Sequence, residues 1–152
     1  MKEKEEKKKK RVLLICPDNT LDTVYPALIL SLQAARAGAE SMVFFTFDGI
    51  KVILKDGIKK VKYYPKGILG AIPGIPKLFT KMMIKLAEER AGIPSPDLLL
   101  EMCQIEGVKF YACLMTIQMM NLKKEDFIEG VEIIDAEGYM KLALEADVNM
   151  FI

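Results

Sequence analysis

The residues best suited to do chemistry in this chain are its three cysteines, at positions 16, 103 and 113. A cysteine thiolate is a nucleophile that attacks disulfide and persulfide sulfur. The chain has no histidine, which excludes Ser-His-Asp and Cys-His catalysis. The cysteines form no C-x-x-C pair, so their spacing does not indicate a metal site. We therefore expect thiol chemistry without a histidine base, and neither a metal nor a cofactor.

Cys113 has the most favourable position of the three. It follows the apolar segment 110–112 and precedes the segment LMTIQMM, which favours a helical turn. Unpaired backbone N–H groups at the start of such a turn, together with the helix dipole, stabilise a thiolate or a persulfide anion. Most unpaired cysteines are instead small buried hydrophobic residues. Position alone supports both interpretations of Cys113 about equally.

The other two cysteines give weaker signals. Cys103 lies four residues after Leu99 on the apolar face of a predicted helix, which indicates a core residue. Cys16 ends a predicted strand and would act as a resolving thiol for Cys113 if their two strands were neighbours. Core packing is the favoured interpretation of Cys16, because strand order cannot be read from the sequence.

The elements that must position these residues alternate along the chain. Short apolar runs at 11–15, 42–46, 108–112, 131–134 and 148–152 predict five strands. Helical spacing of apolar residues lies between them, at 25–35, at 77–90, after the N-cap signal Ser95-Pro96 and around Tyr139. This alternation predicts an α/β fold, a three-layer sandwich with a mostly parallel five-stranded sheet and helices on both faces.

In a parallel sheet, ligands bind beyond the carboxyl ends of the strands. Residues that follow the predicted strands therefore line the expected site: Cys16, Asn19, Thr46, Phe47, Met115 and Thr116, beside Cys113. No G-x-G-x-x-G fingerprint follows a strand, so a dinucleotide site is not indicated. Binding of another small ligand near Asn19 and Thr46 remains an alternative.

The segment GILGAIPGIP, residues 67–76, is predicted to be a long loop because three glycines and two prolines disfavour a regular element. Its apolar residues Ile68, Leu69, Ile72 and Ile75 have three interpretations: packing beneath the loop, a subunit contact or a membrane contact. Packing beneath the loop is the favoured one, and membrane contact is the least favoured.

The first eleven residues carry a net charge of +4, and the remainder holds 15 basic and 18 acidic residues. Residues 1–10 are therefore expected to form a flexible charged tail, and residues 11–152 a single domain. A slightly acidic body does not fit a nucleic-acid-binding protein. No apolar run matches a signal peptide or a transmembrane segment, which makes the cytoplasm the expected location.

Several segments, taken together and in order, resemble the DsrE/DsrF/DsrH-like proteins, and in particular the branch labelled peroxiredoxin-like. They are Asp22-x-x-Tyr25-Pro26-Ala27-Leu28-Ile29-Leu30, Phe44-Phe45-Thr46-Phe47 with Gly49, Lys81-Met82-Met83, Gly107-Val108-Lys109-Phe110-x-Ala112-Cys113-x-Met115-Thr116 and Glu145-Ala146-Asp147-Val148. The resemblance implies a parallel α/β fold, homo-oligomers and sulfur handling by a cysteine persulfide. It places the family's cysteine at Cys113 and its small hydroxyl residue at Thr116.

The resemblance turns the balance at Cys113 towards a reactive sulfur. The sequence thus predicts a sulfur carrier or sulfurtransferase that relays sulfane sulfur on Cys113, working with a donor or acceptor protein. Whether the protein is an enzyme or only a carrier is left open. The alternative is a non-enzymatic oligomeric scaffold, or a small-ligand-binding protein, in which Cys113 is structural and residues 67–76 form the interface.

Overall fold

The computed structural model describes residues 8–152, and the N-terminal segment 1–7 lies outside the described residues. The strands are β1 (Arg11–Cys16), β2 (Glu40–Phe45), β3 (Lys109–Cys113), β4 (Val131–Ile134) and β5 (Val148–Phe151). The α-helices are α1 (Leu21–Arg36), α2 (Ile75–Ala91), α3 (Pro96–Ile105), α4 (Leu114–Met119) and α5 (Ala136–Glu145). Four 3₁₀ helices complete the chain: η1 (Phe47–Ile53), η2 (Ile58–Lys60), η3 (Gly67–Ala71) and η4 (Lys124–Asp126).

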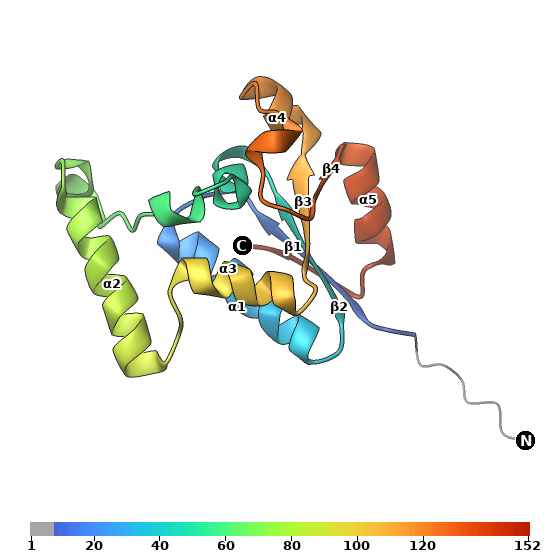
Figure 1. The fold of residues 1–152 in the computed structure, drawn as a ribbon, viewed down its shortest axis with the longest axis horizontal. Helices are drawn as coiled ribbons and strands as arrows, with labels where there is room; N and C mark the ends of the chain where they lie inside the picture. The colour runs from blue at the N-terminus through green and yellow to red at the C-terminus, as the bar shows by residue number, and fades with distance from the viewer. Residues whose placement is uncertain (1–7) are drawn as a thin grey trace, which may run out of the picture.

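The five strands form one parallel sheet in the order β4-β3-β2-β1-β5 (Figure 1). Because all the strands run the same way, all their carboxyl ends meet at one edge. The central strand β2 separates β1 from β3, and its register with β3 places Phe45 beside Ala112. The residues after β2 and β3 are therefore next to each other in space.

Alternating side chains of the strands divide the core into two clusters. Leu14, Cys16, Val43, Phe45 and Ala112 pack with α1 and α3 on one face of the sheet. Leu13, Met42, Phe44, Tyr111 and Cys113 pack with α5 on the other face, where the rings of Phe44 and Tyr139 lie 4.8 Å apart. The predicted three-layer α/β sandwich with a parallel five-stranded sheet is confirmed.

Helix α1 covers the centre of the sheet because its apolar residues recur at helical spacing. Leu21, Val24, Leu28 and Leu32 are all buried. The helix ends before Gly38, whose φ of 86° is a left-handed conformation that glycine adopts without steric cost. The tight turn returns the chain directly into β2.

The predicted long loop at residues 67–76 is partly wrong. Residues 67–71 form the 3₁₀ helix η3, and α2 already begins at Ile75, with Pro76 in its first turn where the missing N–H costs nothing. The packing of its apolar residues beneath the loop is also wrong, since Ile68 is 84% exposed and Leu69 is 50% exposed. These side chains face solvent because α2 lies to one side of the sheet (Figure 1).

Within residues 8–152, no helix is both long enough and apolar enough to cross a bilayer.

Candidate functional site

Cys113 is the last residue of β3 and stands directly before the first turn of α4. Its side chain lies on the α5 face of the sheet, in the cluster with Phe44 and Tyr111. The residue is 8% exposed, so the sulfur is covered but lies near the surface. The sequence placed this residue after the strand; the structure places it in the final position of the strand.

The groups around Cys113 stabilise its thiolate. Burial on its own acts to raise the pKa of Cys113, but hydrogen-bonding groups outweigh it and the pKa is lowered. These groups are the backbone N–H and the hydroxyl of Thr116, the hydroxyl of Thr46 and the backbone N–H of Met115. The N–H groups are available because the first turn of a helix has no internal acceptors for them. Of the three cysteines, Cys113 is the one whose pKa is lowered, whereas burial raises the pKa of Cys16 and of Cys103.

Two threonines from neighbouring strand ends meet beside this cysteine. Thr46 follows β2 and Thr116 lies in α4, and their hydroxyl oxygens are 3.3 Å apart. The backbone N–H of Phe47 donates to the Thr116 hydroxyl oxygen at 3.0 Å. Since that oxygen accepts from Phe47, its own proton is free to be donated to Thr46 or to the sulfur of Cys113. Thr116 is fully buried, so its orientation is fixed by these partners.

Phe47 adopts an unusual backbone conformation at this point. Its φ is 45°, in the left-handed region that a bulky residue rarely occupies. This conformation costs of the order of 1–3 kcal/mol and persists only where the surrounding structure imposes it. Here it directs the N–H of Phe47 to Thr116, while the aromatic side chain is 51% exposed. The exposed ring gives the site an apolar rim.

Gly49 allows η1 to pack closely on the end of β1. A Cβ atom at this position would lie 2.1 Å from the carbonyl oxygen of Cys16, and the Gly49 N–H donates to the carbonyl oxygen of Pro17 at 3.1 Å. Only glycine permits this approach. The contact holds the start of η1, and therefore Phe47, against the sheet.

Cys16 does not join the site. Its strand β1 is separated from β3 by β2, and its side chain packs on the α1 face, opposite Cys113. The Cys16 thiol donates to the carbonyl oxygen of Asp18 at 3.4 Å, and burial raises its pKa to about 12. The condition for a resolving thiol, neighbouring strands, is not met, and Cys16 is a buried core residue, which is the interpretation that the sequence favours.

The remaining predicted residues fall into two groups. Met115 contributes its backbone N–H to the sulfur and has a half-exposed side chain. Asn19 lies in the loop after β1, where its N–H donates to the Asp18 carboxylate at 2.7 Å. No hydrogen bond within residues 8–152 joins Asn19 to Cys113, Thr46 or Thr116. The structure therefore brings Cys113, Met115, Thr116, Thr46 and Phe47 together. The Cys16 thiol lies on the other face of the sheet, although the Cys16 carbonyl oxygen accepts from the Thr46 N–H at 3.2 Å.

Cys103 is buried between α3 and α1, as the sequence predicts for a core residue. Its thiol donates to the carbonyl oxygen of Leu28 at 3.4 Å, and burial raises its pKa to about 11. In the part of the chain from Lys8 onward, no three His, Cys, Asp or Glu side chains gather as metal ligands.

Two solved structures share the fold. The ychN protein from Escherichia coli matches with a TM-score of 0.63 and 12% identity, over 94% of this chain and 99% of that one. Protein MTH1491 from Methanobacterium thermoautotrophicum matches with a TM-score of 0.53 and 15% identity, over 93% of this chain and 98% of that one. At these identities the likeness shows the fold alone.

Sequence comparison is more specific. The sulfur carrier protein DsrE2 of Allochromatium vinosum is 34% identical over 159 residues, which span 94% of this chain and 98% of that protein. The uncharacterized protein YrkE of Bacillus subtilis is 28% identical over 158 residues, 94% of this chain and 97% of that protein. The model of the DsrE/DsrF/DrsH-like family matches residues 7–151. The chain therefore belongs to the DsrE/DsrF/DrsH-like family.

Proposed function

We propose that this protein is a sulfur carrier that holds sulfane sulfur as a persulfide on Cys113. The observation that carries the proposal is the lowered pKa of Cys113, set by the N–H groups and hydroxyls around a sulfur that lies near the surface. Similarity to a sulfur carrier protein over nearly the whole chain supports the same role. The other two cysteines are fully buried with raised pKa values, which leaves Cys113 as the reactive thiol.

The transfer step needs no redox partner. The Cys113 thiolate attacks the outer sulfur of a donor persulfide R–S–SH, a sulfur–sulfur bond forms to Cys113, and the donor's own sulfur–sulfur bond breaks. The donor leaves as the thiolate R–S⁻, and the proton remains on the transferred sulfur or passes to solvent. An acceptor thiolate reverses the step on Cys113. Bonds and electrons balance because one sulfur–sulfur bond replaces another.

The surroundings of Cys113 suit the anion that results. The terminal sulfur of a persulfide carries negative charge in the deprotonated form, and the donors from Thr116, Thr46 and Met115 stabilise charge in this region. The exposed ring of Phe47 and the exposed side chain of Met115 offer an apolar contact to a partner protein that approaches the sulfur. A protein donor or acceptor of sulfur is therefore part of the proposal.

Homo-oligomeric assembly and a cytoplasmic location complete the proposal. The exposed apolar side chains of η3 and α2 provide a surface for a second copy: Ile68, Leu69, Ile72, Leu78 and Met82. All three cysteines are free thiols, the form that a reducing compartment maintains.

Mass spectrometry after incubation with a small persulfide donor tests the carrier role. The wild type is expected to gain the mass of one or more sulfur atoms on the peptide containing Cys113, and reduction should remove it. Cys113→Ser should abolish the gain, whereas Cys16→Ser and Cys103→Ser should retain it. An unmodified wild type, or a Cys113→Ser variant modified to the same extent, would contradict the proposal and favour the scaffold alternative.

A further inference from the structure

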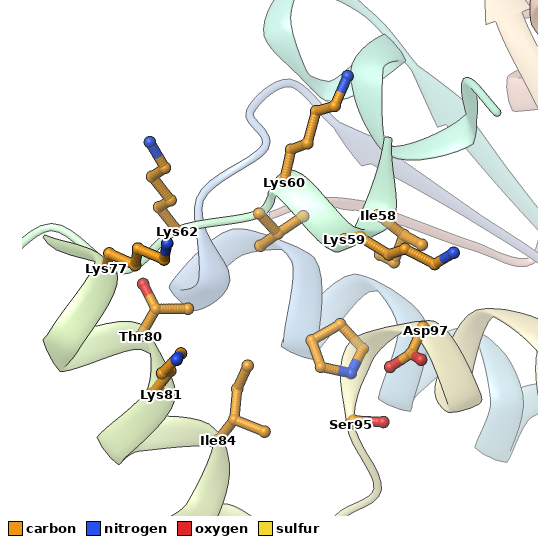
Figure 2. Close-up of a pocket in the computed structure, with 12 residues that line it drawn as sticks. Ile58, Lys59, Lys60, Lys62, Lys77, Thr80, Lys81, Ile84, Ser95 and Asp97 are labelled. Atoms are coloured by element: carbon orange, nitrogen blue, oxygen red, sulfur yellow. The ribbon is translucent and has the colours of Figure 1, made fainter. Parts of the chain in front are cut away.

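A cavity lined by lysines lies away from Cys113, between η2, α2 and the start of α3 (Figure 2). Its volume is about 640 Å³, within the range of about 300–1,000 Å³ that is typical of small-molecule sites. Five lysines and one aspartate line it: Lys59, Lys60, Lys62, Lys77, Lys81 and Asp97. The proposed sulfur chemistry makes no use of this cavity.

Most lysines of the cavity have no acidic partner. Some lysines elsewhere do form ion pairs, for example Lys85 with Glu89 on α2 and Lys141 with Glu137 on α5. Among the lining residues, Lys59 pairs with Asp56 at 2.8 Å. Within residues 8–152, Lys60, Lys62, Lys77 and Lys81 form no ion pair with a carboxylate. The lining therefore concentrates uncompensated positive charge.

Two of these lysines lie on the same side of the cavity. Lys77 and Lys81 flank Thr80 on α2. The backbone N–H of Tyr63 donates to the Thr80 hydroxyl at 2.7 Å, which holds the segment after η2 against α2. Figure 2 shows Lys77 and Lys81 on the α2 side and Ser95 and Asp97 on the opposite side, while the Lys62 side chain extends away from the other two lysines.

The floor of the cavity is apolar. Ile58 and Val61 are buried, and Ile84 of α2 and Pro96 of α3 complete the surface. The Thr80 hydroxyl is already used, since it donates to the carbonyl oxygen of Pro76 and accepts from Tyr63. No aromatic side chain lines the cavity, so there is no platform on which a nucleobase would stack. The occupant must then combine negative charge with an aliphatic body.

We infer that this cavity binds an organic phosphate whose organic part is aliphatic. The phosphate, a dianion, lies beside Lys77 and Lys81, and the aliphatic part covers Ile84 and Pro96. Such a ligand is either a free metabolite or the headgroup region of an anionic phospholipid. The site is separate from Cys113 and does not depend on the proposed sulfur chemistry.

Calorimetric titration of the full chain with octyl phosphate, below its micelle concentration, tests this inference. Octyl phosphate is expected to bind more tightly than inorganic phosphate, which lacks the chain, and than octyl glucoside, which lacks the charge. Lys77→Gln/Lys81→Gln should weaken binding of octyl phosphate by about tenfold or more, since two charged contacts are lost. The matched control Lys85→Gln/Lys141→Gln removes the same charge outside the cavity and should bind as the wild type does.

Sedimentation with vesicles separates the two sources of the ligand. If the source is a lipid headgroup, the wild type will bind vesicles that contain phosphatidylcholine and phosphatidic acid but not vesicles of phosphatidylcholine alone. The Lys77→Gln/Lys81→Gln variant will not bind the vesicles that contain phosphatidic acid. Binding of octyl phosphate without vesicle binding assigns the site to a free metabolite. Absence of binding to both probes, equal affinity for octyl glucoside, or equal losses in the control variant would overturn the inference. Cys113 persulfidation should be unchanged in all these variants.

Discussion

The hydroxyl oxygens of Thr46 and Thr116 lie 3.3 Å apart although the two residues are separated by 70 positions in the chain. The pairing of β2 with β3 makes this contact, because it places the residues after the two strands side by side. Both hydroxyls act on the sulfur of Cys113 in the direction that lowers its pKa. This contact links the fold of the sheet to the reactivity of the thiol.

Alkylation of Cys113 is expected to be faster at neutral pH than alkylation of a free cysteine. The lowered pKa increases the thiolate fraction below the ordinary thiol pKa of about 8.5. Iodoacetamide modification followed by peptide mass spectrometry across pH should give a midpoint below that value for Cys113. Cys16 and Cys103 should stay unmodified in the native state, and labelling of either at the rate of Cys113 would refute this assignment.

Thr116→Val is expected to raise the pKa of Cys113, since the variant removes a hydroxyl that stabilises the thiolate by hydrogen bonding. The valine leaves the N–H of Phe47 without its acceptor, so the free energy of unfolding should also fall by about 1–3 kcal/mol. The pH profile of alkylation and denaturant unfolding measure the two effects. Thr116→Ser, which keeps the hydroxyl, is the control; an unchanged profile in Thr116→Val would rule out a role of this hydroxyl.

Alkaline pH is expected to destabilise the protein through its two core cysteines. Burial raises the pKa of Cys16 to about 12 and of Cys103 to about 11, so folding favours the neutral thiols. Their contribution to the free energy of unfolding is complete below the thiol pKa of about 8.5 in the unfolded state. It is lost as pH rises towards the pKa values of the folded state. Urea unfolding of the wild type and of Cys16→Ser/Cys103→Ser at a series of pH values measures this. Between about pH 8.5 and 11, the free energy of unfolding of the double variant should fall less than that of the wild type.

Gly49→Ala is expected to destabilise the fold by about 2 kcal/mol or more, because the added methyl would overlap the carbonyl of Cys16. Displacement of η1 should also shift Phe47 and thereby slow the alkylation of Cys113. In Gly138→Ala on α5 the new Cβ would lie 3.3 Å from its nearest neighbours, and a change within about 1 kcal/mol is expected. Thermal unfolding compares the two; equal stability changes would contradict the close approach at Gly49.

Ile72→Glu is expected to reduce the oligomeric state of the protein if η3 and α2 form the contact between copies. Ile72 is 41% exposed among other apolar side chains, and a buried unpaired carboxylate in an interface is strongly unfavourable. Size-exclusion chromatography with light scattering measures the change. Lys66→Glu reverses a charge next to η3 without entering its apolar surface and should leave the assembly unchanged. An Ile72→Glu variant that assembles like the wild type would exclude this surface.

Much of the fold follows from local patterns in the sequence. The five apolar runs predicted the strands within a few residues, and the helical spacing between them predicted α1, α3 and α5, because burial on one or both faces leaves a clear period. Cys113 could be placed at a strand end for the same reason. The sequence indicates Thr46 and Thr116 separately, each as a residue that follows a strand.

The relations between elements could not be predicted. Local patterns do not encode strand order, which is why the sequence allowed Cys16 to approach Cys113 and the structure does not. The contact of Thr46 with Thr116 depends on the same order. The left-handed φ of Phe47 carries no sequence signal, since a bulky residue adopts it only under tertiary constraint. The lysine cavity likewise joins residues 58–62 to α2 and α3, which the sequence presents as unrelated segments.

The separation of Cys16 from Cys113 determines how long a bound sulfur atom would stay on the protein. Two strand spacings, about 9.6 Å, exceed the Cα separation of about 7 Å that a disulfide tolerates, and the two side chains lie on opposite faces. Cys16 therefore cannot expel a sulfur atom from Cys113 by closing an internal disulfide with it. If Cys113 carries a persulfide as proposed, its discharge through Cys16 is excluded, and the residence time of the sulfur depends on encounters with a thiol of another molecule.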